Sequence, residues 1–175
     1  MSILKVRKYP DPVLKKKALP VKSVTERERG LIEDMIETMK LSEGVGLAAT
    51  QVGVSKRIIV FNPSCDGWRA DALINPVIVK KRGSEKKEEG CLSLPGINGL
   101  VRRSTCIVVE GLDIKGRPVC FEARSLLARI CQHEIDHLDG ILFIDYLSPE
   151  DKGKNSEIIN AIIEKNRAKL GKILL

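Results

Sequence analysis

Residues 125–140 read SLLARICQHEIDHLDG and indicate a helix near the centre of the chain. The segment places apolar and ionisable side chains at helical spacing. The residues near one face are Leu126, Leu127, Ile130, Cys131, Glu134 and His137. We expect this helix to begin near Ser125 and to end at Gly140, because glycine commonly follows the last turn of a helix.

The segments around this helix predict strands before it and helices towards both ends of the chain. A capping box at Thr25–Glu28 opens an amphipathic helix that we expect to stop at Gly44. Ser148-Pro149 indicates the start of a C-terminal helix, residues 149–175. The β-branched or alternating runs are Arg57–Phe61, Leu73–Val79, Thr105–Leu112 and Pro118–Ala123. We therefore predict a single α+β domain, residues 1–175, with antiparallel strands packed around the central helix.

Composition narrows the class of protein. The 175 residues are 43% apolar and 30% charged, which is typical of a globular chain. No apolar run reaches the roughly 18 residues of a membrane span, and the charged N-terminus lacks a signal-peptide core. We therefore expect no membrane association and a cytoplasmic protein. The five cysteines form no CxxC pair, which argues against a secreted disulfide framework.

The net charge of +7 raises the question of a polyanionic partner. The basic residues are scattered, with short clusters such as Lys15–Lys17 and Lys80–Arg82, and no aromatic residues interleave with them. No nucleic-acid motif is present. Solvated faces are the favoured interpretation, and general attraction to RNA-rich surroundings is the alternative.

Both histidines of the chain lie in the segment His133-Glu134-Ile135-Asp136-His137, an HExxH motif. Residues four apart share a helical face, so both imidazoles can bind one metal ion, with Glu134 beside it as a base. A catalytic site of this kind needs a third protein ligand, which here must be Cys, Asp or Glu. Cys91, flanked by glycine and proline, is one candidate, and the carboxylates downstream of the motif form no recognisable pattern.

A third segment, Gly44–Gly53, is rich in small residues and contains one amide side chain, that of Gln51. It lacks the spacing of a nucleotide-binding loop. Small residues beside one amide instead suit a narrow cleft next to an extended peptide.

Together the three segments resemble the motifs of the peptide deformylase family, bacterial type. The family patterns GxGLAAxQ, EGCLS and HExDH are matched at Gly44–Gln51, Glu89–Ser93 and His133–His137, without departure. The resemblance implies a metal-dependent hydrolase that removes the formyl group from the N-terminal formyl-methionine of new polypeptides and releases formate. The same resemblance implies one divalent metal ion, Fe²⁺ in cells, at a site compatible with Zn²⁺, Ni²⁺ or Co²⁺.

The resemblance also implies roles for individual residues. The metal ligands would be Cys91, His133 and His137. Glu134 would be the general base and then the general acid, and the Gln51 amide and the Leu92 N–H would stabilise the oxyanion. An ion pair between Glu89 and Arg103 would support the metal-binding loop.

For the substrate, we expect the methionine side chain to bind near Ile130, with Val45 and Leu94 in the lining. A tight cleft at Gly44–Gly46 would admit the small formyl group. Nascent formyl-methionyl polypeptides are then the partners. The lysines and arginine of the C-terminal helix suggest transient ribosome contact.

Two other functions stay open at the level of sequence. An endopeptidase could use HExxH, with a wider cleft and a third ligand downstream of the helix. The other alternative is a non-enzymatic metal-binding or RNA-binding protein. If its metal were a structural zinc ion, protein ligands would fill all four coordination positions.

Overall fold

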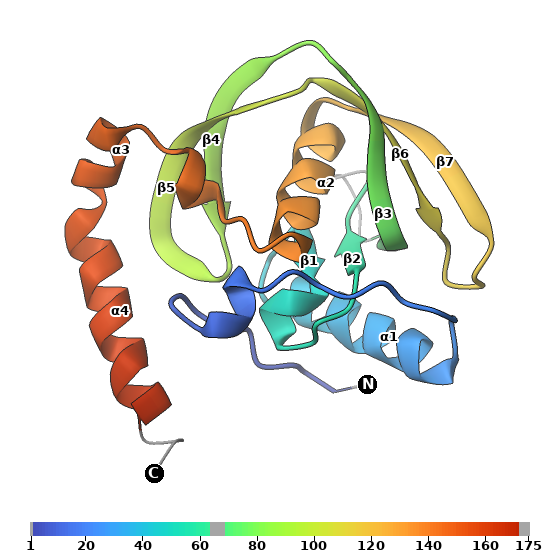
Figure 1. Ribbon diagram of the computed structural model, residues 1–175, viewed down its shortest axis with the longest axis horizontal. Helices are drawn as coiled ribbons and strands as arrows, with labels where there is room; N and C mark the ends of the chain where they lie inside the picture. Colours follow the sequence, from blue (N-terminus) through green and yellow to red (C-terminus); the bar gives the residue numbers. More distant parts are fainter. Residues whose placement is uncertain (1, 64–68, 172–175) are drawn as a thin grey trace.

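The computed structural model describes residues 2–63 and 69–171 of the chain (Figure 1). The α-helices are α1 Glu26–Leu41, α2 Ser125–Leu138, α3 Pro149–Lys154 and α4 Ser156–Gly171. The 3₁₀ helices are η1 Pro12–Lys15, η2 Ala49–Val52 and η3 Phe143–Tyr146. The strands are β1 Gly46–Ala48, β2 Ile58–Phe61, β3 Asp71–Arg82, β4 Glu85–Cys91, β5 Leu94–Arg103, β6 Cys106–Leu112 and β7 Pro118–Arg124.

The described strands form two sheets whose neighbouring strands are antiparallel. The larger sheet has five strands in the order β1-β2-β3-β6-β7, and β4 and β5 form a separate two-stranded sheet. In the view of Figure 1, the β4–β5 hairpin lies on one side of α2, and β6 and β7 lie on the other. The predicted α+β class with antiparallel strands is confirmed.

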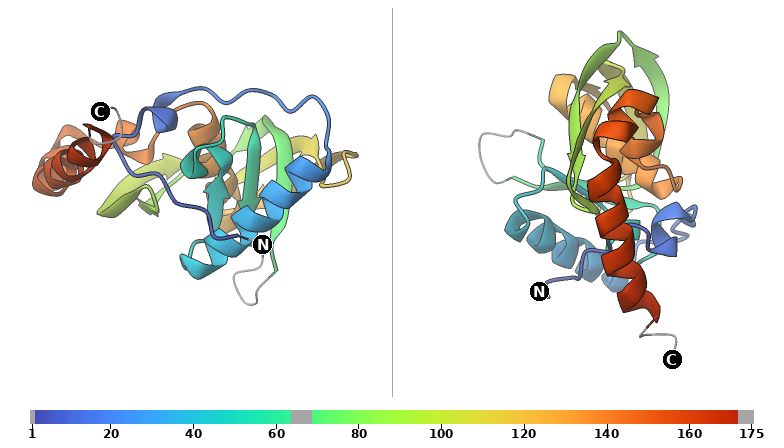
Figure 2. Two further views of the ribbon diagram at one scale, coloured as in Figure 1. Left: turned by 90° about the horizontal axis from the view of Figure 1, so that it is seen from below. Right: turned by 90° about the vertical axis from the view of Figure 1, so that its left-hand side faces the viewer.

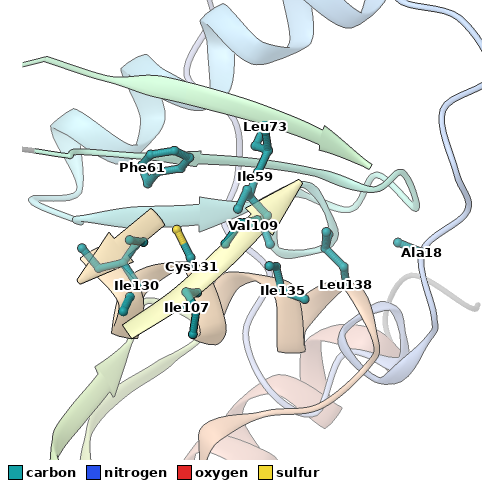
Figure 3. Close-up of a cluster of buried hydrophobic side chains, with 13 residues drawn as sticks. Ala18, Ile59, Phe61, Leu73, Ile107, Val109, Ile130, Cys131, Ile135 and Leu138 are labelled. Carbon is teal, nitrogen blue, oxygen red and sulfur yellow. The ribbon is translucent and has the colours of Figure 1, made fainter. Parts of the chain in front are cut away.

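The five-stranded sheet is covered on both faces, because successive residues of a strand point to opposite sides. On β2, Ile59 and Phe61 pack in a cluster with α2, whereas Ile58 and Val60 pack in a cluster with α1. Figure 3 shows Cys131, Ile135 and other α2 side chains directed at the sheet residues. The motif helix is therefore held by a fully buried face.

The predicted start of α1 is confirmed, and the predicted glycine stops of α1 and α2 differ in outcome. The capping box forms at Thr25, whose N–H donates to Glu28 Oε2 at 2.9 Å. The helix ends at Leu41, before the predicted stop at Gly44, because the chain turns at Glu43 with φ of 53°. After α2, Gly140 has φ of 74°, and a Cβ there would lie 2.5 Å from the Lys15 carbonyl oxygen. Glycine is required at that turn.

The sequence predicts one helix over 149–175, and the structure forms two, α3 and α4, with 172–175 outside the described residues. Asn155 separates them, because its side-chain amide donates to the Asn98 carbonyl at 3.1 Å and to the Asp151 carbonyl at 2.8 Å. Helix α4 lies along one side of the molecule beside β5 (Figure 2). Its Ile159 and Ile162 pack on a third apolar cluster.

The hairpin β4–β5 was not predicted as strands. Its sequence is rich in charged residues and glycine, which are depleted in strands, so it lacks a β-branched run. The strand β5 nevertheless alternates, with Ile97, Val101 and Arg103 buried and the residues between them largely exposed. No helix in the described part of the chain has the length and apolar character that crossing a membrane requires.

Candidate metal and catalytic site

Three ligand atoms from two separate elements meet at the centre of the molecule. Cys91 ends β4, and His133 and His137 lie one turn apart on α2. Their ligand atoms all lie within 4.8 Å of one another, and Cys91 Sγ is 3.2 Å from His137 Nε2. Among the described His, Cys, Asp and Glu residues, these three form the group of at least three that is placed to hold a metal ion.

The donor set fits a divalent transition metal. One thiolate and two imidazoles suit Fe²⁺, Co²⁺, Ni²⁺ and Zn²⁺. His133 Nδ1 donates to Glu89 Oε2 at 2.9 Å, which leaves Nε2 free to face the site. A histidine whose second nitrogen donates to a carboxylate is typical of metal ligands, because the bond fixes the tautomer and the ring.

The Cys91 loop is a tight connection between β4 and β5. Cys91 pairs with Leu94, and the Ser93 N–H donates to Cys91 Sγ at 3.4 Å. Gly90 passes close to β5, where a Cβ would lie 2.7 Å from Asn98 Oδ1. The loop therefore places the sulfur next to α2 through close backbone packing.

A buried ionic network lies behind His133. Arg103 Nε and Nη2 donate to Glu89 Oε1 and Oε2 at 2.9 and 3.0 Å, so the expected ion pair is present and bidentate. Arg129 Nη1 donates to the same Glu89 Oε1 at 2.6 Å. Burial by itself would raise the pKa of Glu89, but the hydrogen bonds from His133 and Arg103 outweigh it and hold that pKa at about 2. Glu89 is therefore an ionised acceptor.

Glu134 lies on α2 next to His133 with 4% of its surface exposed. Its Oε2 has no hydrogen-bond partner among the described protein atoms. Burial raises the pKa of this carboxyl group to about 7, which favours proton exchange near neutral pH. A Cβ on Gly46 would lie 2.5 Å from Glu134 Oε1, so the glycine makes room for the carboxylate.

Gln51 is oriented by its own backbone neighbourhood. Its Oε1 accepts from the Ala48 N–H at 2.8 Å, and its Nε2 is then 3.4 Å from Cys91 Sγ and 3.3 Å from Ser93 Oγ. The donor end of the amide therefore faces the site.

The N-terminal segment fastens the loops that carry Gln51 and Leu92. The Arg7 N–H donates to the Gln51 carbonyl at 2.7 Å, and the Tyr9 N–H donates to the Ser93 carbonyl at 3.0 Å. Between them the Lys8 ammonium group donates to the Leu92 carbonyl. These bonds fix the backbone at both Gln51 and Leu92.

A cavity of about 410 Å³ opens onto Glu134 and His133. Of the expected substrate-binding residues, Gly44, Val45, Gly46 and Ile130 line it, and Val45 is 46% exposed at the mouth. Leu94 does not line this cavity. It is fully buried in the third apolar cluster with Leu14 and Phe143, because the register shift at Gly90/Cys91 and the positive φ of Gly96 interrupt the alternation of β5 and place Leu94 on the core side.

Sequence reasoning missed two residues of the network, Arg129 and Asp136. Asp136 pairs with Arg103, whose guanidinium group also lies over the Tyr146 ring, 4.9 Å from its centroid. Arg129 precedes His133 by four residues, so the two share a helical face. That spacing is the one signal in the sequence that places Arg129 near the site.

Residues 3–153 match the sequence model of a family described as Polypeptide deformylase. The chain is 52% identical over 145 residues to a peptide deformylase from Halothermothrix orenii, covering 83% of this chain and 94% of that one. It is 44% identical over 172 residues to one from Alkalilimnicola ehrlichii, covering 98% and 97%.

Solved structures give the same result. The fold is similar to that of a peptide deformylase from Legionella pneumophila, with a TM-score of 0.87, 40% identity, and coverage of 95% of this chain and 98% of that one. It is also similar to a peptide deformylase from Ehrlichia chaffeensis in complex with actinonin, with a TM-score of 0.86, 40% identity, and coverage of 95% and 99%.

Proposed function

The chain belongs to the polypeptide deformylase family, and from this premise we propose that Cys91, His133 and His137 hold its metal and that Glu134 moves the proton. The protein is an enzyme, a metal-dependent hydrolase that removes the N-formyl group from the N-terminal formyl-methionine of nascent polypeptides and releases formate. Of the three functions considered from the sequence, deformylation is therefore the one that applies, and the endopeptidase and the non-enzymatic binding protein are set aside.

The observation that carries the residue assignment is the convergence of the three ligand atoms beside a buried, unpartnered carboxylate in one cavity. When bound, the metal supplies a Lewis acid that makes water nucleophilic near neutral pH. Glu134 accepts a proton from the attacking water, because its carboxylate has an open acceptor oxygen and a pKa of about 7. It then returns the proton to the amine nitrogen that leaves.

The negative charge that develops on the formyl oxygen needs fixed donors. We assign this role to Gln51 Nε2, which its bond to Ala48 turns towards the site, and to the Leu92 N–H. The Lys8 and Tyr9 bonds hold the peptide units around Leu92, so these donors are in place before the reaction. Preorganised donors stabilise charge without rearranging during the step.

The methionine side chain binds in the cavity lined by Ile130 and Val45, and the Gly44–Gly46 backbone restricts the space beside Glu134. A formyl group is small enough for such a space, and a larger acyl group meets the wall at Gly46. The Glu89–Arg103 pair supports the site by holding His133 Nδ1.

The reaction has a direct test. Iron-loaded protein prepared without oxygen is expected to release formate from formyl-Met-Ala-Ser, and Glu134→Gln is expected to lose about 10²–10⁴-fold in rate while still binding metal. Chelation is expected to abolish activity, and added Fe²⁺ to restore it. No release from the wild type, or equal release from both proteins, refutes the assignment.

For the metal itself we propose Fe²⁺ in cells, with Zn²⁺, Ni²⁺ and Co²⁺ as compatible replacements. An iron–thiolate site oxidises readily, since thiolates are the form of cysteine that oxidants attack. Metal analysis of protein isolated without oxygen, followed by air exposure of the Fe²⁺ and Ni²⁺ forms, tests this. Equal survival of the two forms in air contradicts the iron proposal.

The substrate is a nascent chain, so we propose that the enzyme works in the cytoplasm and contacts ribosomes transiently through its C-terminal segment. Lys152, Lys154, Lys165 and Arg167 are exposed there, which suits phosphate contacts. Charge reversal of Lys165 and Arg167 is expected to reduce ribosome co-sedimentation at low salt. The same reversal at the exposed Lys86 and Lys87 of β4 serves as the matched control, and equal effects refute a specific role for α4.

A further inference from the structure

The metal ligands belong to two parts of the fold that share no strand pairing. Cys91 lies on the β4–β5 hairpin, which forms its own sheet, whereas His133 and His137 lie on α2 against the five-stranded sheet. Within the described residues no backbone ladder joins the two sheets. The position of the sulfur relative to the imidazoles therefore depends on side chains that connect the hairpin to α2.

Arg129 makes the most extensive of these connections. From α2, its Nη1 donates to Glu89 Oε1 at 2.6 Å and to the Val101 carbonyl at 3.0 Å. Its Nη2 donates to the Glu85 carbonyl at 3.0 Å. One guanidinium group thus bonds β4 at two places and β5 at one, and its side chain is only 10% exposed.

The same carboxylate is also held by a metal ligand. Glu89 accepts from His133 Nδ1, and His133 lies one helical turn after Arg129. Glu89 in turn precedes Cys91 by two residues on β4. Arg129 and His133 therefore donate hydrogen bonds to the same carboxylate, that of Glu89, from adjacent turns of α2. This carboxylate lies two residues before Cys91, the third metal ligand.

We propose that Arg129 is a positioning residue that locks the β4–β5 hairpin onto α2 and so fixes Cys91 at metal-binding distance from the two histidines. The proposal rests on the metal site assigned above. Arg129 acts through Glu89 and the hairpin backbone, and it need not touch the substrate.

A second side-chain connection joins the hairpin to α2, and it determines which strand the loss of Arg129 would release. Arg103, on β5, pairs with Asp136 one turn beyond His133 on α2. With both connections the hairpin is held on either side of His133. With Arg129 removed, β5 keeps the Arg103–Asp136 pair and the two Gln132–Ser104 bonds that follow it. The strand β4, which carries Cys91, loses its two bonds to Arg129 and keeps the bond from His133 to Glu89, so β4 is the strand that we expect to shift.

The test is metal binding by the metal-free protein, measured with Co²⁺ under anaerobic conditions by chelator competition. Arg129→Met is expected to weaken Co²⁺ affinity by about 10–100-fold, the usual effect of losing a group that orients a ligand. The sulfur-to-cobalt charge-transfer absorption is expected to weaken as well, because Cys91 is the ligand displaced. Faster hydrogen exchange in β4 and β5 is the matching backbone readout.

Two further variants separate positioning from general stability. Arg129→Lys keeps the positive charge, so it is less prone to a folding failure than Arg129→Met. An ammonium group cannot reproduce the forked hydrogen bonds to one carboxylate and two carbonyls. We therefore expect Arg129→Lys to lose Co²⁺ affinity, but less than Arg129→Met does. Lys56→Met removes another cation from a buried carboxylate, that of Glu28, away from the site. It is expected to lower stability and to leave Co²⁺ affinity unchanged.

Wild-type Co²⁺ affinity in a folded Arg129→Met or Arg129→Lys protein overturns the proposal, as does an equal loss in Lys56→Met. The titration needs no formylated peptide. A wild type that binds Co²⁺ but releases no formate therefore defeats the proposed function and leaves the positioning role of Arg129 standing.

Discussion

Gly46→Ala is the substitution whose effect on this enzyme can be worked out most directly from the structure. The added Cβ would lie 2.5 Å from Glu134 Oε1, 2.9 Å from Glu134 Cγ and 2.8 Å from Ile130 Cγ2. All three distances are far below a normal contact, so something must move. The carboxylate end of Glu134 is the more flexible neighbour, whereas Ile130 is branched at Cβ and stiff on a helix.

We therefore expect Glu134 to be displaced by about 1 Å and the free energy of unfolding to fall by about 1–3 kcal/mol, the usual cost of an extra methyl group in a packed region. A displacement of about 1 Å in a catalytic group can cost about 10²-fold in rate. The three atoms nearest to the added Cβ belong to Glu134 and Ile130 and none is a metal-ligand atom, so metal content is expected to stay at the wild-type level. Activity thus falls further than the small stability loss would explain.

Formate release, metal analysis and urea unfolding of the same preparations measure the three quantities. Gly30→Ala is the matched control, because nothing lies within 4 Å of a Cβ at that position on α1. Alanine is favoured over glycine in a helix, so this variant is expected to gain up to about 1 kcal/mol and to keep full activity. A Gly46→Ala protein with wild-type turnover would show that Glu134 does not depend on that space.

Two more outcomes follow from the site and from the first helix. Gln51→Met removes one oxyanion donor and is expected to lower kcat by about 10²–10³-fold with Co²⁺ binding retained, and a decrease confined to KM would contradict that role. Hydrogen bonds from Lys56 and then from Thr25 lower the pKa of Glu28 from 4.5 to about 2. Because the folded pKa is the lower one, the stabilisation is present above pH about 4.5 and disappears as the pH falls towards 2. Urea midpoints are therefore expected to separate Glu28→Gln from wild type at pH 7 and to bring them closer at pH 3, and a constant gap would argue against an ionised Glu28.

The elements that sequence reasoning recovered are those set by neighbours along the chain. The capping box at Thr25, the turn at Gly140 and the amphipathic face of α2 each depend on residues within about one helical turn. The hairpin β4–β5 was missed for the converse reason. Its strands are stabilised by each other and by packing on η3 and α4, and their own residues have low strand propensity.

The residues of the candidate site also fall into those set by neighbours along the chain and those set by long-range packing. Leu94 was expected in the substrate pocket and lies in the core instead, because the register shift of the β4–β5 hairpin near Cys91 interrupts the alternation of β5. Alternation along the sequence does not reveal such a shift. Arg129 was missed because its partners, Glu89 and two backbone carbonyls, lie 28 to 44 residues away in the chain.

The sequence by itself determined that His133, Glu134 and His137 stand together, since the geometry of one helix turn fixes residues four apart on one face. It could not place Cys91 among them, because 42 residues and two sheets separate the sulfur from the first imidazole. Only the tertiary structure brings that thiol to the histidines, buries Glu134 so that its pKa rises to about 7, and shows the guanidinium groups that hold the hairpin to the helix. These features depend on burial and long-range packing, which the local order of residues does not encode.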